Sequence, residues 1–333
     1  MKIVVFELEP WEREAFRPLE QAHEVVFVEA PLDETRVADH ADADIVSVFI
    51  HSKLTADVIR ALERVRLVAT RSTGVDHIDL AACKECGITV TNVPTYGDHT
   101  VAEHVFALLL ALSRTLVDAV DRTRRGDFSL TGIDGFDLAG RTMGLIGTGG
   151  IGRHTAKIAR GFDMEVIAFD VAPDPEAAAE FGFTYVELDE LLARADVVSL
   201  HVPGTPQTEN LLGQREFERM KDGAVLINTA RGSVVDTEAM LHALASGKLR
   251  GVGLDVLAEE PTVREEAELL RSYFAKAANL ETLLADHILL RLRNVVVTPH
   301  SAFKTKEAVE RILATTRANI EGFLEGAPEN VVA

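Results

Sequence analysis

The stretch TMGLIGTGGIGRHTAKIARGFDMEVIAFD, residues 142–170, decides the fold prediction. An apolar run, residues 143–146, leads into glycines at 147, 149 and 152, and a helical pattern then precedes a second apolar run, residues 166–169. In a dinucleotide site the first glycine permits a tight turn, the second lets a pyrophosphate approach the backbone, and the third lets helix and strand pack closely. The stretch therefore predicts a nucleotide site of the Rossmann type rather than an ordinary glycine turn.

Asp170 closes this unit and bears on the choice of cofactor. It lies 170 − 152 = 18 residues after Gly152, near the spacing of about 20 expected for the acid that holds a ribose 2′-hydroxyl. Because a carboxylate at this place would repel a 2′-phosphate, the sequence favours NAD over NADP.

Composition limits the class of protein and its partners. The chain has 333 residues, 47% of them hydrophobic, with a formal net charge of −19. The length suits two domains, and the acidic balance disfavours nucleic acid and anionic membranes as partners; whether that acidity is a solubilising surface or a salt-adapted one stays open. We expect a cytoplasmic protein, since the N-terminus reads as a strand rather than a signal peptide and the longest apolar run, residues 105–112, is too short to cross a bilayer.

The two cysteines, Cys83 and Cys86, have the C-x-x-C spacing of a redox pair or half of a zinc site. No second cysteine pair completes a zinc site, and the motif lies in an alanine-rich helical stretch that ends at Gly87. We therefore predict two reduced thiols on a helix, and no metal.

Short β-rich runs alternate with helical patterns along both halves of the chain, which indicates parallel sheets covered on both faces. The strands expected in the first half are residues 3–6, 24–28, 44–48, 67–70 and 88–91. Those expected in the second half are residues 142–146, 165–169, 197–201, 224–228, 252–255 and 295–298.

Two longer helical patterns suggest how the halves are connected. Residues 99–125 read as one long helix linking two domains, and residues 304–325 read as a helix that returns to the first domain. The predicted fold class is thus α/β, with two doubly wound parallel-sheet domains. A Rossmann NAD-binding domain, residues 99–301, is inserted in a discontinuous, flavodoxin-like substrate domain formed by residues 1–98 and 302–333.

Three charged or titratable side chains follow strands of the second half, where an open α/β sheet binds its ligands. The guanidinium group of Arg231 can clamp a carboxylate or polarise a carbonyl. His300 can exchange a proton with a hydroxyl group, and a neighbouring carboxylate would hold its tautomer and raise its pKa. Glu260 and Glu259 are equal candidates for that carboxylate on spacing alone.

Seven segments together show a resemblance to the D-isomer-specific 2-hydroxyacid dehydrogenases over essentially the full chain. They are STGVDHIDL (72–80), NVPTYGDHTVAEH (92–104), the GTGGIG turn (147–152), HVP (201–203), NTARGSVVDTEAM (228–240), GVGLDVLAEEP (251–261) and NVVVTPHSAF (294–303).

The resemblance implies roles for individual residues. Arg231 matches the substrate-binding arginine, His300 the acid/base histidine, and Glu260, rather than Glu259, its paired carboxylate. The implied cofactor contacts are Gly147, Gly149, Gly150, Ile151 and Gly152 on the pyrophosphate, Asp170 on the ribose, His201, Val202 and Pro203 beside the adenine, and Thr229, Ala230 and Asp255 beside the nicotinamide. Thr73 and Gly74 would offer N–H groups to the substrate carboxylate.

The substrate is less sharply indicated. Tyr96 and Phe303 resemble residues that border the substrate in the D-lactate dehydrogenase branch, although ordinary packing explains each equally well. Residues 49–54 are expected to form the side-chain pocket. Residues 262–290 form a longer segment than in the glyoxylate and phosphoglycerate branches, and it could cover the active-site mouth, meet a partner subunit or be a plain surface helix.

We therefore expect an NAD-dependent enzyme that interconverts a small 2-keto acid, most readily pyruvate, and its D-2-hydroxy acid. A hydroxypyruvate or glyoxylate reductase is the nearest alternative. An NAD-sensing, corepressor-like binding protein is the alternative from another class. The resemblance also implies a homodimer formed through the nucleotide domain.

Overall fold

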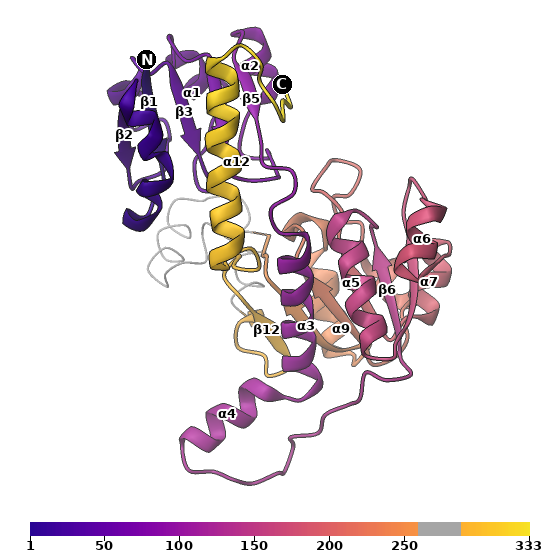
Figure 1. The fold of residues 1–333 in the computed structure, drawn as a ribbon. Helices are drawn as coiled ribbons and strands as arrows, with labels where there is room; N and C mark the ends of the chain where they lie inside the picture. Colours follow the sequence, from indigo (N-terminus) through magenta and orange to yellow (C-terminus); the bar gives the residue numbers. More distant parts are fainter. Residues whose placement is uncertain (259–287) are drawn as a thin grey trace. The chain divides into compact units, whose positions relative to one another are not determined.

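The computed structural model describes residues 1–258 and 288–333, and the chain divides into two compact units (Figure 1). The first unit consists of Met1–Tyr96 and Lys304–Ala333, and the second of Gly97–Phe303. Each unit contains one sheet in which every paired strand is parallel. The predicted fold class, two parallel-sheet α/β domains, is therefore confirmed.

The first unit has a five-stranded sheet in the order β2-β1-β3-β4-β5. Its strands are β1 (Lys2–Phe6), β2 (Glu24–Val28), β3 (Ile45–Val48), β4 (Leu67–Thr70) and β5 (Thr89–Thr91). Its helices are η1 (Pro10–Gln21), η2 (Val37–His40), α1 (Ala56–Ala61), α2 (Leu80–Glu85) and α12 (Lys306–Leu324).

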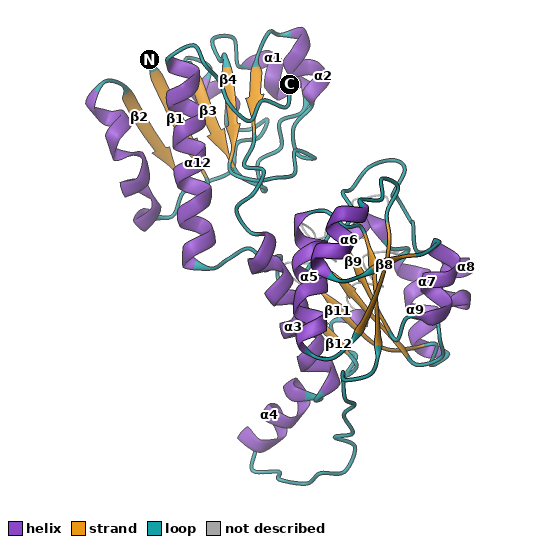
Figure 2. Cartoon of the chain, turned by 45° about the vertical axis from the view of Figure 1, so that its right-hand side comes forward, coloured by secondary structure: helices purple, strands orange, loops and turns teal. Residues whose placement is uncertain are grey.

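Both faces of this sheet are buried, which is why its strands read as continuous apolar runs. Val4, Val46 and Val68 share one core cluster with Val58 of α1 and Ala82 of α2. On the other face α12 packs against η1 and β4 (Figures 1 and 2). The last residues of the chain also join this unit, because Val90 N–H donates to the carbonyl oxygen of the C-terminal residue.

The second unit has a seven-stranded sheet in the order β12-β11-β10-β9-β6-β7-β8. Its strands are β6 (Thr142–Ile146), β7 (Glu165–Phe169), β8 (Thr184–Tyr185), β9 (Val197–Leu200), β10 (Ala224–Asn228), β11 (Leu249–Leu254) and β12 (Val295–Val297). Its helices are α3 (Asp98–Ser113), α4 (Leu116–Arg124), α5 (Gly150–Gly161), α6 (Pro175–Phe181), α7 (Leu188–Arg194), α8 (Gln214–Arg219), η3 (Gly232–Val234) and α9 (Thr237–Ala245).

Helices cover both faces of this sheet (Figure 2). Helices α3 and α5 contribute Val105 and Ala156 to one core cluster, whereas α7 and α9 contribute Leu191 and Met240 to another. The strand order reverses between β6 and β9, so the crevice above their carboxyl ends is the expected ligand site of such a sheet.

The single long helix predicted over residues 99–125 is wrong in one respect, because the structure breaks it into α3 and α4. Thr115 lies between them with a left-handed φ of 50°. The carbonyl oxygen of Ser113, which would continue the helix, instead accepts from Phe136 N–H at 2.8 Å. The two helices are bent by 63° at this point.

Within the part of the chain that the structure describes, only this bent pair of helices meets the length and composition expected of a membrane span. Among the described residues, no single helix is long and apolar enough to cross a membrane, and α3 and α4 pass on length and composition only when they are taken together across the bend. Val105, Leu108 and Leu109 of α3 are buried in the core.

Both cysteines are free thiols associated with α2, as predicted. Cys83 is buried, and burial raises the pKa of its thiol to about 11, so it stays protonated. Cys86 is the exposed C-cap residue of the same helix. The two cysteines therefore serve as structural residues of α2 and its C-cap, with their thiols unlinked.

Candidate active site

The glycine turn after β6 has the geometry that a pyrophosphate requires. Gly147 has a left-handed φ of 99°, and a Cβ there would lie 2.6 Å from the carbonyl oxygen of His201. A Cβ on Gly152 would lie 2.3 Å from the carbonyl oxygen of Gly147. Beside Gly149, in contrast, no atom lies within 4 Å of the Cβ position, so a ligand has room to approach the backbone where α5 begins.

Asp170 lies at the carboxyl end of β7 and closes this turn from the side. Its carboxylate accepts from Thr148 N–H at 2.7 Å, Thr148 Oγ1 at 2.8 Å and Ala172 N–H at 2.9 Å. Burial alone would raise the pKa of Asp170, but the hydrogen bonds from Ala172 and Thr148 outweigh it and hold the pKa below its usual value. The carboxylate is therefore charged at neutral pH and held rigidly beside the glycine turn.

Two buried polar atoms at the same edge of the sheet have no hydrogen-bond partner among the described residues: His201 Nδ1 and Thr229 Oγ1. His201 follows β9, and its Nε2 lies 3.0 Å from Ser199 Oγ. Burial lowers the pKa of His201 to about 3, so its ring is neutral. Since buried polar groups are normally paired, orphaned atoms at the carboxyl edge fit the contact surface of a bound polar ligand such as NAD.

The loop after β10 is folded by a residue whose role the sequence did not reveal. The buried side chain of Asn228 donates to the carbonyl oxygen of Arg231 at 2.9 Å and accepts from Ala230 N–H at 2.9 Å. The guanidinium of Arg231 donates to Ala230 O at 2.8 Å, and its side chain lies against Gly204, where a Cβ would come within 2.9 Å of Arg231 Cγ. Asn228 thus fixes the turn that presents Arg231.

His300 lies after β12 in a strained turn, with a left-handed φ of 51°. Its N–H donates to the carbonyl oxygen of Asp255 at 2.9 Å. The carboxylate of Asp255, only 1% exposed, accepts from Ser301 N–H at 2.9 Å, Ala302 N–H at 2.8 Å and the hydroxyl of Thr298. Strained backbone outside glycine clusters at functional sites, where surrounding contacts maintain it. Asp255 supplies those contacts on both sides of His300.

His104 of α3 completes this arrangement. Its Nε2 lies 2.9 Å from Thr298 Oγ1 and 3.4 Å from Asp255 Oδ1. Burial alone would raise the pKa of Asp255. The hydrogen bonds from His104, Thr298 and the two backbone N–H groups outweigh this effect and hold the pKa below its usual value, so the carboxylate stays charged. His104 is part of the segment NVPTYGDHTVAEH, but the sequence did not indicate a role for it. Its contacts with Thr298 and Asp255 in the structure show that it helps to hold the Asp255 carboxylate.

The residues expected to bind the substrate carboxylate belong to the first unit. Thr73 and Gly74 follow β4, and Thr73 Oγ1 donates to Val93 O at 2.7 Å. The side-chain amide of Asn92 donates a hydrogen bond to the carbonyl oxygen of Thr73 at 2.8 Å. Tyr96 ends this part of the unit, and its carbonyl oxygen accepts from Arg311 of α12 at 2.7 Å. Arg231, His300 and Phe303 belong to the second unit.

Glu260 and its rival Glu259 lie outside the described residues, as does most of the segment 262–290. The proposed pairing of Glu260 with His300 therefore stays a prediction. The structure describes only the last residues of that segment, 288–290. Of these, Leu289 is buried in the core of the second unit.

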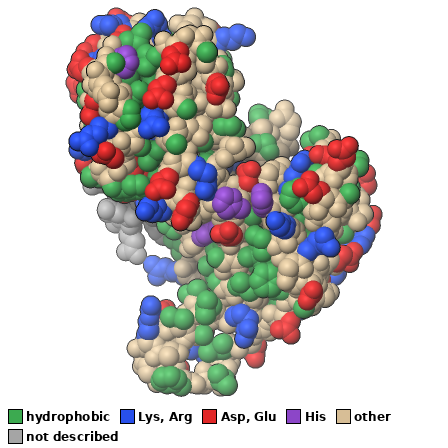
Figure 3. All heavy atoms as spheres, viewed as in Figure 1, with side chains coloured by type: hydrophobic (Ala, Val, Ile, Leu, Met, Phe, Trp, Pro, Cys, Tyr) green, Lys and Arg blue, Asp and Glu red, His purple; other side chains and the backbone are tan. Residues whose placement is uncertain are grey.

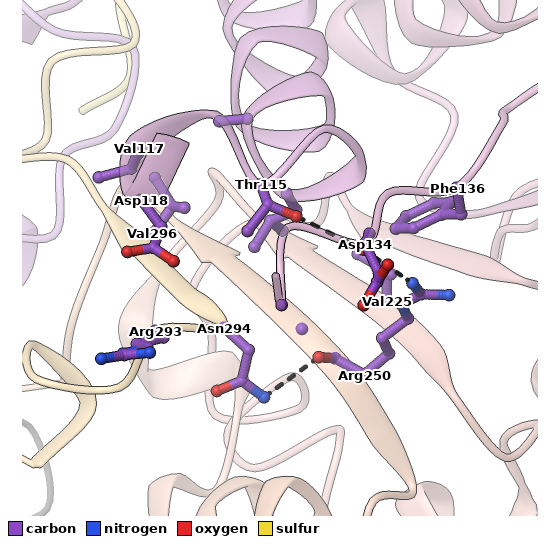
Figure 4. A pocket seen from close by; sticks show the side chains of 14 residues that line it. Thr115, Val117, Asp118, Asp134, Phe136, Val225, Arg250, Arg293, Asn294 and Val296 are labelled. Carbon is purple, nitrogen blue, oxygen red and sulfur yellow. Dashed lines mark hydrogen bonds between the residues drawn. The ribbon is translucent and has the colours of Figure 1, made fainter. Parts of the chain in front are cut away.

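A hollow in the second unit is not the candidate active site (Figure 4). It is lined by Thr115, Phe136, Val225, Arg250 and Asn294, among other residues. The last three lie at the amino ends of β10, β11 and β12, the edge opposite to the one that carries Arg231, Asp255 and His300. Ligands of open parallel sheets bind at the carboxyl edge, so this hollow is not where the chemistry is expected.

Comparison with known proteins agrees with this geometry. Residues 106–302 match the model of the D-isomer specific 2-hydroxyacid dehydrogenase, NAD binding domain. The chain is 34% identical over 334 residues to D-lactate dehydrogenase of Escherichia coli, covering 98% of each chain. It is 36% identical over 316 residues to glycerate dehydrogenase of Methylorubrum extorquens, covering 93% of this chain and 92% of that one.

The chain belongs to the D-isomer-specific 2-hydroxyacid dehydrogenase family. Its structure is similar to that of D-lactate dehydrogenase from Aquifex aeolicus in complex with NAD and lactic acid, with 35% sequence identity, a TM-score of 0.88, and coverage of 99% of this chain and 98% of the other. The sequence-based predictions of the family, of an oxidoreductase and of NAD as cofactor are therefore confirmed. The glycine turn and the orphaned atoms at the carboxyl edge fit that cofactor.

Asp255→Asn tests whether this dehydrogenase depends on the buried carboxylate to hold the His300 turn. The asparagine NH2 group would face backbone N–H donors, so we expect the free energy of unfolding to fall by about 2 kcal/mol. Amide exchange at Ser301 and Ala302 should accelerate. Both are measured on the purified protein, by denaturant titration and by hydrogen exchange.

Asp236→Asn is the matched control. Asp236 caps α9 by accepting from Ala239 N–H at 3.1 Å, and asparagine caps a helix as well as aspartate does. Equal losses of stability in the two variants, with unchanged exchange at Ser301 and Ala302, would contradict the role given to Asp255.

Proposed function

We propose that this dehydrogenase interconverts a small 2-keto acid and its D-2-hydroxy acid, with pyruvate and D-lactate as its main pair. The observation that carries the proposal is the presence of two turns at the same edge of the sheet, after two strands that flank β11. Arg231 follows β10 and His300 follows β12, on either side of β11 and Asp255. A cation for a carboxylate and an imidazole for a hydroxyl are the two groups that reduction of a 2-keto acid requires.

In the proposed reaction Arg231 binds the substrate carboxylate and polarises the keto oxygen. NADH, when bound, supplies the hydride. His300 donates a proton to the oxygen as the keto carbon is reduced, and takes it back in the oxidation direction. Glu260 is proposed to hold the protonated imidazole. Because the His300 turn is fixed by Asp255, the imidazole is positioned before substrate arrives, which reduces the reorganisation needed in the reaction.

The remaining residues are proposed to bind cofactor and substrate. Gly147, Gly149, Gly150, Ile151 and Gly152 would meet the pyrophosphate, Asp170 the ribose, His201, Val202 and Pro203 the adenine, and Thr229, Ala230 and Asp255 the nicotinamide. For Asp255 this requires a second hydrogen bond on Oδ2, which an ionised carboxylate oxygen can accept. Thr73 and Gly74 would bind the substrate carboxylate, with Tyr96 and Phe303 bordering the substrate.

The second candidate function is reduction of hydroxypyruvate or glyoxylate. It is favoured by the similarity to a glycerate dehydrogenase over most of both chains. These acids carry the same 2-keto carboxylate group, so they would use Arg231 and His300 in the same way and differ only in the side chain.

Turnover with a panel of 2-keto acids tests the proposed function. We expect NADH oxidation with pyruvate at a higher kcat/KM than with hydroxypyruvate or glyoxylate. His300→Gln should lower kcat by about 10²–10⁴-fold, the usual contribution of a general acid, while NADH binding measured by fluorescence is retained. His242→Gln, on the exposed side of α9, is the control. An NADH-binding protein without turnover on any 2-keto acid would favour the corepressor-like alternative, and full activity in His300→Gln would refute the chemistry.

Asp170→Asn tests the proposed ribose contact. The substitution keeps the shape of the side chain and removes the charge that repels a 2′-phosphate. Because juxtaposed like charges cost several kcal/mol, the ratio of kcat/KM for NADPH to that for NADH should rise at least about tenfold. Asp174→Asn, which keeps its capping position on α6 and lies near Arg153, should leave the ratio unchanged. A constant ratio in both variants would remove Asp170 from cofactor selection.

We also propose that the enzyme is a cytoplasmic homodimer assembled through the second unit. Hydrophobic side chains gather on α4 and the segment after it (Figure 3), with Val117 54%, Phe128 77% and Leu130 82% exposed. Exposed apolar groups of this kind mark association surfaces. Sedimentation should give a dimer, which Leu130→Glu dissociates and Val171→Glu, at an isolated exposed position, does not. A wild-type monomer would contradict the proposal.

A further inference from the structure

Glu7, the first residue after β1, has an unusual backbone and a fully engaged carboxylate. Its φ of 54° is left-handed, a conformation in which glycine is the usual residue. Its Oε1 accepts from Phe49 N–H at 3.0 Å and Ser52 N–H at 2.9 Å, and its Oε2 accepts from His51 N–H at 2.9 Å. The hydroxyl of Ser52 donates to Oε1 as well. One carboxylate thus fixes the loop of residues 49–52 after β3.

Arg71, the first residue after β4, fixes the backbone of Glu7 in turn. Its guanidinium donates to the carbonyl oxygens of Phe6 at 2.6 Å and Glu7 at 2.9 Å, and to Ser47 Oγ at 3.2 Å. Arg71 is 2% exposed, and burial lowers its pKa to about 10 against the opposing effect of the Glu7 and Glu12 charges. It therefore remains charged at neutral pH. The Phe49 ring lies over this guanidinium, 5.6 Å from Cζ to the ring centroid.

The position of this network in the sheet points to ligand binding. The sheet order is β2-β1-β3-β4-β5, so the chain reverses direction across the sheet between β1 and β3. Ligands of doubly wound sheets bind at the carboxyl ends of strands at such a reversal. Glu7 and residues 49–52 occupy that point, and Arg71 lies two residues before Thr73 in the loop after β4.

We propose that Glu7 is a positioning residue that fixes residues 49–52 as the wall against the substrate side chain and so sets the size of 2-keto acid that the enzyme accepts. The inference rests on the proposed function. Phe49 and Ile50 are half-buried in this loop and supply the apolar surface. A purely structural turn would favour glycine at position 7, because a left-handed residue with a side chain costs about 1–2 kcal/mol. The three hydrogen bonds that backbone N–H groups donate to its carboxylate explain why a glutamate occupies position 7.

Glu7→Gln tests the proposal with little change in shape. A glutamine oxygen directed at Phe49 and Ser52 places its NH2 group against the His51 N–H, so the loop loses one hydrogen bond and gains a donor–donor contact. We expect the loosened wall to admit larger side chains. The ratio of kcat/KM for pyruvate to that for phenylpyruvate should fall about tenfold, within the range that pocket contacts contribute. The change should appear mainly in KM, with kcat for pyruvate and KM for NADH retained.

Two further variants keep the test decisive. Ser52→Ala removes one donor to the same carboxylate and should shift the ratio in the same direction by about threefold, which covers the case in which Glu7→Gln does not fold. Glu14→Gln removes the same charge from the exposed side of η1, where Glu14 pairs with Arg17, and should change nothing. Wild-type turnover with an unchanged ratio in both loop variants would overturn this inference alone. Absence of wild-type turnover on every 2-keto acid would overturn the proposed function and the inference with it.

Discussion

The buried carboxylate of Asp255 is the interaction on which the candidate active site depends. Residues 298–302 turn sharply after β12, and His300 has a left-handed backbone. A free loop would not hold that conformation, because a non-glycine residue there is strained. Four donors on Asp255, two backbone N–H groups, the Thr298 hydroxyl and His104, make the strained turn the most favourable arrangement. The backbone of His300 is therefore positioned by Asp255 and, through His104, by α3.

The same device recurs at other strand ends. Asp170 after β7 accepts from Thr148 and Ala172, and Glu7 after β1 accepts from residues 49–52. In each case a carboxylate at the carboxyl edge of a parallel sheet organises a loop through its N–H groups. Such bonds to a charged acceptor are stronger than neutral ones. The strands fix where each loop begins, and the carboxylates fix the backbone of the loop that follows, at the edge where we propose that cofactor and substrate bind.

Much of this could be predicted from sequence, for physical reasons. Strands buried on both faces read as apolar runs, and the glycine turn is legible because Gly147 and Gly152 have no space for a Cβ. The two-residue strand β8 was missed because so short a run has no pattern. Strand β11 begins three residues before the predicted start because the exposed Arg250 and the following glycine interrupt the apolar run that marks a buried strand. The break at Thr115 depends on Phe136, distant in sequence, taking the Ser113 carbonyl. His104, Glu7 and Arg71 were missed for the same reason, since each contacts residues far from it in sequence. Asn228 acts within its own turn, where its side-chain hydrogen bonds appear only once the backbone is folded.

We propose that these fixed loops make a dehydrogenase specific for one hand of a 2-hydroxy acid. The configuration of the product tests it most directly. The wild-type enzyme is given NADH and the 2-keto acid that it turns over fastest among those whose reduction creates a chiral centre, which leaves out glyoxylate. The hydroxy acid is then resolved on a chiral column. We expect the D enantiomer alone. An L product would contradict the proposed D specificity. A racemic product would show that the carbonyl is not held in one orientation by Arg231 and His300.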